Sequence, residues 1–411
     1  MISTSKNVPI PIPRNGVDYR GKVVLAPMVR SGELPSRLLA LRYGADLVWG
    51  PETVDRALIG TTRHHNPHTQ TIDFTRLPSN GSRIPKQDQK ESLIYRLHPT
   101  KEHGRLIFQI GTSSPTLAVQ AAKLVAGDVA GIDVNAGCPK PFSTSGGMGA
   151  ALLRTPNLLA SILEALVKEV GEVWEIGISV KIRLLETPEQ TEALVRRLCG
   201  TGITGLTVHC RTTPMRPRER ALREQLRMVA DVCRETGVAC LMNGDVEDRD
   251  QALQLIQEFA VDGAMIATKA EANSSCFRTR EEGGLLPWRE VTKEYIKTAL
   301  EIENRWGNTK FLLGQLMPGK AREYKSVTGS RSYVEVCEIL NLEGLVDRAR
   351  DVDGKLGLAM RQSKAVDKAK LNQSARAAGH NPARIRSSPS ETRHPLAERG
   401  VGIIPALAMG S

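Results

Sequence analysis

Short apolar runs recur along this chain, and each is followed by a stretch with helical spacing. The runs are largely continuous and rich in β-branched residues, which is typical of strands buried on both faces of a parallel sheet. Eight of them occur, at residues 23–26, 45–49, 106–110, 131–135, 178–182, 206–209, 239–243 and 264–267.

The segments between these runs repeat apolar residues at helical intervals. Clear examples are 115–126, 188–198, 222–235 and 249–259, and Thr187-Pro188 is a typical helix start. Eight βα units in succession predict the α/β class and a closed (β/α)8 TIM barrel rather than an open doubly wound sheet. A doubly wound dinucleotide fold would need Gly-x-Gly-x-x-Gly after the first strand, and this chain has Ala-Pro-Met-Val-Arg there.

The barrel is expected over residues 21–284, preceded by a flexible N-terminal segment, residues 1–20. Within the barrel, residues 55–104 are an insertion between the second and third strands. The patterns of 71–74 and 93–96 predict that this insertion is a β-hairpin lying over the barrel mouth.

After residue 284 the alternation of predicted strands and helices ends. Helical spacing over 288–305, 309–316 and 333–350 predicts a small helical domain of residues 285–350. Residues 351–411 are rich in Ala, Ser, Arg and Pro and show little periodicity, so a disordered basic tail is expected there.

Charge and cysteine content narrow the class of protein. The net charge is +11, with ten Lys and Arg against five Asp and Glu in residues 351–411. A positive surplus fits nucleic-acid phosphates, although a solvated tail explains it equally well. The seven cysteines form no Cys-x-x-Cys pair, which argues against disulfides or structural zinc and for reduced thiols. Without a run of eighteen apolar residues or a signal-peptide pattern, a cytoplasmic or nuclear protein with no membrane span is expected.

Polar residues stand where the predicted strands end. Active sites of (β/α)8 enzymes lie at the carboxyl ends of the strands, so these residues predict a single site. A snorkelling lysine or a structural histidine would explain any one of them alone, but a polar group at the end of six strands favours a site. In chain order they are Pro27 and Met28, Gln109, Asn135 to Cys138, Lys181, His209, Asn243 to Asp245, and Ala267 and Thr268.

This set suits a flavin ring and its phosphate. Gln109 can bind the pyrimidine edge of the ring as donor and acceptor, and a cationic Lys181 would stabilise an anionic reduced ring. Backbone N–H groups around Gly244 and Thr268 match the usual phosphate site of the barrel. His209 would hold the ribityl chain or phosphate, the alternative being a structural histidine in a strand.

Cys138 differs from the other cysteines, which are expected to be buried and inert. Gly137 and Pro139 flank it in a loop at the catalytic end of the barrel. An ordinary thiol, with a pKa near about 8.5, is mostly protonated at neutral pH and suits a proton donor. No His or Cys lies at metal-ligand spacing around it, so no metal is expected.

Five motifs taken together resemble the tRNA-dihydrouridine synthases in order and spacing, over about residues 22–345. They are Ala26-Pro-Met-Val-Arg30, Asn135-x-Gly-Cys-Pro139, Lys181-x-Arg183, Val208-His-Cys-Arg211 and Asn243-Gly-Asp245. The sequences Gly-Cys-Pro-Lys-Pro-Phe-Ser and Gly-Gly-Met-Gly-Ala-Ala-Leu-Leu are most similar to the eukaryotic, fungal-type branch acting at position 20 of cytoplasmic tRNA.

The resemblance implies an FMN-dependent oxidoreductase. NADPH or NADH would reduce FMN, a hydride would pass to C6 of a D-loop uridine, and Cys138 would protonate C5. Asn135, Arg183 and Arg211 would contact the uracil or nearby tRNA. The residues implied to bind FMN are Pro27, Met28, Val29, Gln109, Lys181, His209, Asn243, Gly244, Asp245, Ala267 and Thr268.

Two features depart from the family pattern. Thr268-Lys269-Ala270 stands where the family commonly has an arginine, and Lys269 would replace that charge. The double-stranded-RNA-binding domain of the animal relatives is not visible in the tail. RNA would then be held by the barrel, the helical domain and the tail.

Two basic groups are candidates for RNA contacts. Five arginines between Arg211 and Arg223 suit phosphates, the alternative being a solvated loop. Lys320, Arg322 and Lys325 cluster beside Tyr324, which can stack on a base or pack in the core. The target uridine would have to leave its stack to reach the site.

Two other functions remain open from the sequence. One is a small-molecule flavin oxidoreductase on the same barrel, acting for example on a free pyrimidine. The other is an RNA-binding scaffold that kept the barrel without catalysis. The tRNA-reducing flavoenzyme, expected to be a monomer, is the preferred interpretation.

Overall fold

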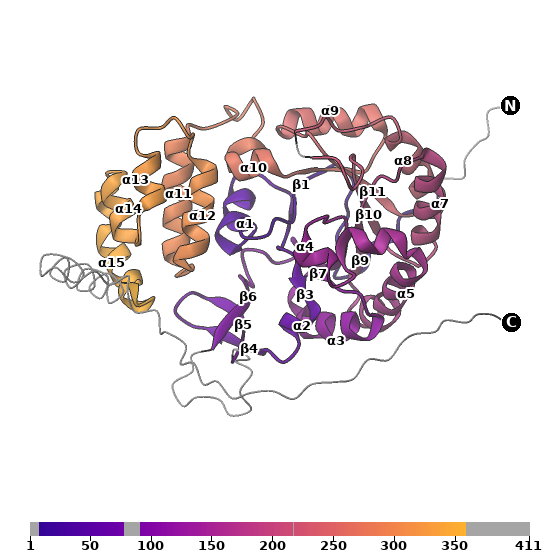
Figure 1. The fold of residues 1–411 in the computed structure, drawn as a ribbon, viewed down its shortest axis with the longest axis horizontal. Helices are drawn as coiled ribbons and strands as arrows, with labels where there is room; N and C mark the ends of the chain where they lie inside the picture. The colour runs from indigo at the N-terminus through magenta and orange to yellow at the C-terminus, as the bar shows by residue number, and fades with distance from the viewer. Residues whose placement is uncertain (1–7, 78–90, 217, 359–411) are drawn as a thin grey trace, which may run out of the picture. The chain divides into compact units, whose positions relative to one another are not determined.

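Eight parallel strands close into a barrel in the computed structural model (Figure 1), which describes residues 8–77, 91–216 and 218–358. The strand order is β2-β1-β12-β11-β10-β9-β8-β7, and β2 also pairs with β7. The eight predicted strands and the TIM barrel are therefore confirmed. The barrel strands are β1 (Lys22–Leu25), β2 (Leu47–Trp49), β7 (Leu106–Gly111), β8 (Gly131–Ala136), β9 (Gly177–Arg183), β10 (Gly205–His209), β11 (Ala239–Asn243) and β12 (Gly263–Ile266).

Helices surround the barrel (Figure 1); those predicted from residues 115, 188 and 249 begin there, whereas the one predicted from residue 222 begins at Leu226. The Ser114, Thr187 and Asp248 side chains cap helices by accepting N–H groups three residues later. The longer helices are α1 (Leu34–Arg42), α3 (Pro115–Val125), α5 (Pro156–Leu166), α7 (Pro188–Cys199), α8 (Leu226–Thr236) and α9 (Arg249–Phe259). Short ones are α2 (Asp55–Leu58), α4 (Pro141–Thr144), α6 (Glu172–Trp174) and α10 (Thr268–Ala272).

Tyr19 fills the amino end of the barrel. Its side chain is 1% exposed and joins the inner apolar cluster that includes Trp49 and Leu241. Strands β8, β9, β10 and β12 each begin with a glycine, and a Cβ on Gly205 would lie 2.8 Å from a Tyr19 ring carbon. Gly205 thus leaves room for this ring at the bottom of the barrel.

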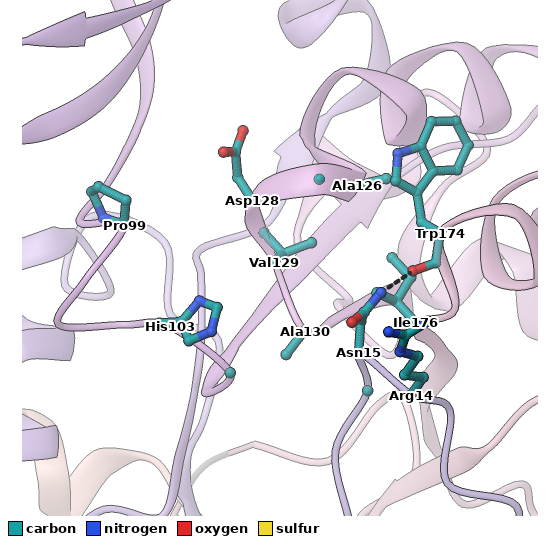
Figure 2. Close-up of a pocket in the computed structure, with 13 residues that line it drawn as sticks. Arg14, Asn15, Pro99, His103, Ala126, Asp128, Val129, Ala130, Trp174 and Ile176 are labelled. Carbon is teal, nitrogen blue, oxygen red and sulfur yellow. Dashed lines mark hydrogen bonds between the residues drawn. The ribbon is translucent and has the colours of Figure 1, made fainter.

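The N-terminal segment was expected to be flexible, but from residue 8 onward it is bound to the barrel. The Val8 N–H donates to the Arg234 carbonyl at 3.2 Å, and the Asn15 amide donates to the Trp174 carbonyl at 3.0 Å (Figure 2). Tyr19 completes the core of the barrel, so the residues before it must follow the barrel wall.

The insertion is a three-stranded antiparallel sheet of β4 (Thr62–Asn66), β5 (Thr71–Arg76) and β6 (Ser92–Leu97). The Tyr95 ring packs edge-on against Phe108 of β7 at 4.8 Å between centroids. Because Gln109 faces the barrel interior, Phe108 faces outward. The expected hairpin is thus corrected to a three-stranded sheet, whose Tyr95 packs on the outer side of β7; its place over the mouth stays a prediction, and residues 78–90 lie outside the described residues.

Five helices follow the barrel (Figure 1), as α11 (Trp288–Glu301), α12 (Trp306–Leu316), α13 (Tyr324–Gly329), α14 (Tyr333–Ile339) and α15 (Val346–Lys355). The single helix expected over 333–350 is two helices, because Asn341 adopts a left-handed conformation (φ 54°) that ends the first. The tail predicted from residue 351 begins inside α15, and residues 359–411 lie outside the described residues. Within the described ranges, no helix combines the length and apolar character needed to cross a bilayer.

Gly205→Ala should destabilise the protein by about 1–3 kcal/mol, because the added methyl overlaps the Tyr19 ring. The matched control is Gly127→Ala, where a Cβ meets no atom within 4 Å, and its effect should stay within about 0.5 kcal/mol. Urea unfolding of both variants measures the difference. Equal stability of the two variants would contradict the packing argument.

Candidate active site

A buried carboxylate organises the interior of the barrel. Asp133 of β8 is 0% exposed and accepts hydrogen bonds from the Gln109 amide at 2.8 Å and the Ser179 hydroxyl at 2.7 Å. Burial raises the pKa of Asp133 to about 6, although these two hydrogen bonds and Lys181 oppose the shift. Gln109 therefore points inward, as predicted, with its amide nitrogen turned toward Asp133.

Lys181 of β9 extends into the same interior, one pleat nearer the carboxyl end. Its ammonium donates to the Asn243 Oδ1 at 3.0 Å, and the Asn243 amide donates to the Met265 carbonyl. Burial, followed by the charge of nearby Arg183, lowers the pKa of Lys181 to about 8. Among the described residues, that ammonium makes one hydrogen bond although it has three donors. It is suited to an anionic or hydrogen-bond-accepting ligand.

A cavity of about 280 Å³ opens where β9 to β12 end. Gly244 has φ +122°, and a Cβ there would lie 3.3 Å from the His209 ring, so the close turn after β11 requires glycine. Lys269 lines the cavity and its ammonium is 3.1 Å from the Glu247 carboxylate. The lining consists of Arg183, His209, Arg211, Asn243, Gly244, Asp245, Val246, Ala267, Thr268 and Lys269, which brings six of the predicted cofactor residues and two predicted substrate residues to a common site with Lys181.

His209 is a neutral side chain in this cavity. Burial, and then the charges of Lys181, Arg183 and Arg211, lower the pKa of His209 far below its ordinary value. The Arg211 guanidinium lies 3.2 Å from the His209 Nε2. Arginine can only donate, so Nε2 is the acceptor and the proton is on Nδ1.

Two arginines fix the loops around the mouth. Arg183 donates to the carbonyls of Gly137 at 2.7 Å and Thr212 at 3.0 Å. Arg211 pairs with the Asp245 carboxylate at 2.5 Å. Burial favours the neutral form of Asp245, but hydrogen bonds from the Ala221 N–H and Arg211 hold its pKa below the usual value. The Asp245 side chain is thus engaged within the protein.

The Cys138 loop follows β8. The Asn135 Oδ1 accepts the N–H groups of Gly137 at 3.0 Å and Cys138 at 3.1 Å, and the Ala150 N–H donates to the Cys138 carbonyl at 2.9 Å. All seven cysteines are free, and Cys138 is the one that is not buried. Burial of part of its side chain raises the pKa of the Cys138 thiol, which therefore stays protonated at neutral pH.

The loop after β1 contributes Pro27, Met28 and Val29. Val29 is 42% exposed, whereas Met28 packs against the core. Arg30, which has φ 72°, lies over the Phe311 ring of α12 at 4.1 Å. This contact joins the mouth of the barrel to the helices that follow it.

Each of the two basic groups exposes three cations, out of five arginines in the loop and out of three residues in the helical part. Arg211 and Arg223 bind Asp245 and neighbouring carbonyls. The other three arginines of the loop are exposed, and so are the basic residues around the half-buried Tyr324. The exposed residues are Arg216, Arg218 and Arg220 in the loop, and Lys320, Arg322 and Lys325 in the helical part.

Sequence reasoning missed two carboxylates, Asp133 and Glu52. Asp133 alternates with Asn135 in the fourth predicted strand, so strand periodicity places both on one face and could have identified it. Glu52 follows β2 within a Gly-Pro-Glu-Thr sequence that carries no recognisable pattern. In the described part of the chain, no group of three or more His, Cys, Asp or Glu side chains could hold a metal ion.

A second cavity, of about 460 Å³, lies at the opposite end of the barrel (Figure 2). Its walls come from the N-terminal segment and from the segments that precede β7, β8 and β9, with Arg14, His103 and Trp174 among them. None of the predicted site residues lines it. In (β/α)8 barrels the amino ends of the strands serve stability rather than catalysis.

Comparison with known proteins gives consistent matches. The family model described as dihydrouridine synthase matches residues 24–305. A Schizosaccharomyces pombe protein named tRNA-dihydrouridine(20) synthase is 53% identical over 310 residues, 75% of this chain and 62% of that protein. Its Saccharomyces cerevisiae namesake is 45% identical over 331 residues, 79% of this chain and 84% of that protein. The S. cerevisiae tRNA-dihydrouridine(20a/20b) synthase is 26% identical over 258 residues, 63% of this chain and 62% of that protein.

Lys181→Met should raise the melting temperature of the ligand-free protein at pH 7. The pKa of Lys181 is lowered from 10.5 to about 8, so its charged form destabilises the fold wherever the lysine is protonated in both states. The gain should be largest below pH 8 and should fade as the pH rises toward 10.5. Thermal unfolding across this range measures it, and a pH-independent loss of stability would contradict the burial argument.

Proposed function

The chain belongs to the dihydrouridine synthase family, and on that premise we propose that it reduces the C5–C6 double bond of a uridine at position 20 of cytoplasmic tRNA. The observation that carries the proposal is the protonated, accessible thiol of Cys138, at the same end of the barrel as Gln109 and Lys181. The relatives at 53% and 45% identity are named for position 20, whereas the relative named for positions 20a and 20b is 26% identical. The first of these relatives is longer, since this chain spans 62% of it.

The donors present at the mouth fit flavin mononucleotide. Gln109 has a carbonyl oxygen and a second N–H left for the pyrimidine edge of the ring. The ammonium of Lys181, with two unused donors, would stabilise negative charge on the reduced ring. The phosphate would lie in the cavity beside Gly244, with the His209 Nδ1–H as a further donor. The other residues proposed to hold the cofactor are Pro27, Met28, Val29, Asn243, Asp245 through its backbone, Ala267 and Thr268.

The bound flavin, reduced by NADPH or NADH, would supply the hydride for C6 of the uracil. Cys138 would donate its proton to C5 and is held for this by Asn135, which fixes the backbone on both sides of Gly137. Arg183 uses two donors on loop carbonyls, and its remaining N–H groups would face the base. Arg211, which lines the same cavity at the mouth of the barrel, would contact the uracil or the nearby tRNA. The cytoplasm or nucleus is the expected site of action because tRNA is the substrate.

In cells lacking this protein, position 20 of tRNA should contain uridine, and the wild-type chain should restore dihydrouridine. Cys138→Ala should restore less than about 1% of it, because a positioned acid contributes 10²–10⁴-fold to such a step. Purified Cys138→Ala should still bind flavin and oxidise NADPH. Sequencing that maps dihydrouridine measures the first result; full restoration by the variant would exclude Cys138 as the proton donor. Loss at another position, or reduction of free uracil as readily as tRNA, would contradict the proposed substrate.

Replacing Arg216, Arg218 and Arg220 together by alanine should raise the KM for tRNA about tenfold at physiological salt, because three phosphate-binding charges are lost. Flavin reduction by NADPH should not change. The matched control removes three exposed arginines near the amino end of the barrel, Arg14, Arg20 and Arg105, and should leave the KM unaltered. If both triple variants weaken tRNA equally, net charge rather than this loop accounts for binding.

A further inference from the structure

Glu52 lies behind the Cys138 loop. It follows β2, and its Oε1 accepts a hydrogen bond from the Ser143 hydroxyl at 2.9 Å. Its Oε2 is buried and has no hydrogen-bond partner among the described residues. A Cβ on Gly111, at the end of β7, would come within 2.5 Å of Oε1, so the glycine makes room for the carboxylate. The carboxylate is thus held in a defined place beside the site.

This carboxylate contacts both ends of the loop that carries Cys138. Ser143, in α4, is 0% exposed and comes after the cysteine. Asn135, before the cysteine, lies close enough to Glu52 to favour its charged form, and its Oδ1 accepts the Cys138 N–H. A Cβ on Gly149 would lie 2.6 Å from the Cys138 carbonyl and 2.4 Å from the Ser143 Oγ, which shows how closely these groups pack.

More cations than anions lie around the Cys138 thiol. Lys140 of its own loop and Lys181 and Arg183 of β9 are cations that favour the thiolate. Burial raises the pKa of Cys138, and Glu52 adds to this as the anion of the group. Burial likewise raises the pKa of Glu52, against the hydrogen bond from Ser143 and the nearby Asn135 amide. The carboxylate therefore opposes three nearby cations.

We propose that Glu52 is a positioning residue for the proton donor: it holds the Cys138 loop through Asn135 and Ser143, and its negative charge keeps the thiol protonated. This inference rests on the proposed function, because a proton donor is useful only if the reaction takes its proton. The hydrogen bonds of the loop determine the position of the Cys138 thiol, and the negative charge of Glu52 favours its protonated form. A change that removes the charge alone separates the two effects.

Glu52→Gln is that change, since the amide keeps the size and one acceptor of the carboxylate. Alkylation of the full-length protein by iodoacetamide reports on Cys138, because the other six cysteines are buried; Cys138→Ala gives the background. At neutral pH the Gln variant should be alkylated about two to five times faster, because more of the thiol is ionised. The alkaline limb of its pH profile for tRNA reduction should move to lower pH, while NADPH-driven flavin reduction is unchanged.

Three further variants complete the test. Glu52→Asp keeps the charge, so its alkylation profile should match the wild type even if turnover falls. Ser143→Ala loosens the loop but keeps the charge, and should lower turnover without moving the midpoint of alkylation. Glu271→Gln is the matched control for the thiol measurement. Glu271 also accepts a hydrogen bond from a serine hydroxyl, that of Ser31 at 2.5 Å, but it lies in α10 rather than beside the Cys138 loop. The alkylation rate of this variant should equal that of the wild type.

The inference would be overturned if the pH profile of alkylation of Glu52→Gln superimposed on that of the wild type. It would also be overturned if Glu52→Asp, which keeps the charge, showed the same shifted profile as Glu52→Gln. The result is independent of the substrate. If the wild type does not reduce tRNA but Glu52→Gln still shifts the thiol, the proposed function fails while the role of Glu52 stands. If tRNA reduction is present and the thiol does not shift, only the role of Glu52 fails.

Discussion

The rest of the site depends on the Asp133 carboxylate inside the barrel. A carboxylate buried there is tolerated only if hydrogen bonds satisfy it, and Gln109 and Ser179 from the neighbouring strands do so. An ionised carboxylate only accepts, so the Gln109 amide nitrogen must face it and the carbonyl oxygen must face the mouth. A slip of β8 by one residue would turn Asp133 and Asn135 outward and carry the Cys138 loop with them. One buried charge therefore sets the register of three strands and the orientation of the groups above them.

The mouth of the barrel gathers more positive than negative charge. Lys181 and Arg183 project from one strand; burial, and then the charges of neighbouring cations, lower the pKa of both Lys181 and His209. Arg211 is neutralised by Asp245, but the Lys181 ammonium has only the Asn243 oxygen as its partner among the described residues. A half-buried cation with a single hydrogen-bond partner is kept at a cost in stability, and that cost is recovered when an anion binds. The arrangement favours a ligand with negative charge near the barrel axis and at its rim.

The sequence predicted the barrel well because its strands are buried on both faces and read as continuous apolar runs. Lys181 and Gln109 were recognised because a polar residue is unexpected in such a run. Asp133 meets the same criterion, since it stands within the apolar run 131–135. Glu52 could not be found, since it is near Cys138 only because β2, β7 and β8 are neighbours in the closed barrel. The packing of the insertion could not be predicted for a similar reason: its alternating strands indicate β-structure, but not that Tyr95 covers Phe108 of β7.

The surroundings of Cys138 suit an acid better than a nucleophile or a metal ligand. Nucleophilic cysteines lie where positive charge and helix ends stabilise the thiolate. Here Lys140 and Arg183 act in that direction, but burial and Glu52 act against them, and the net effect is a raised pKa. The backbone of the loop is tied by Asn135 and Ala150, which holds the Cα of Cys138 in a defined place. A thiol held protonated and in place can give up its proton only to a base generated next to it, such as a carbanion forming as a hydride arrives at the adjacent carbon.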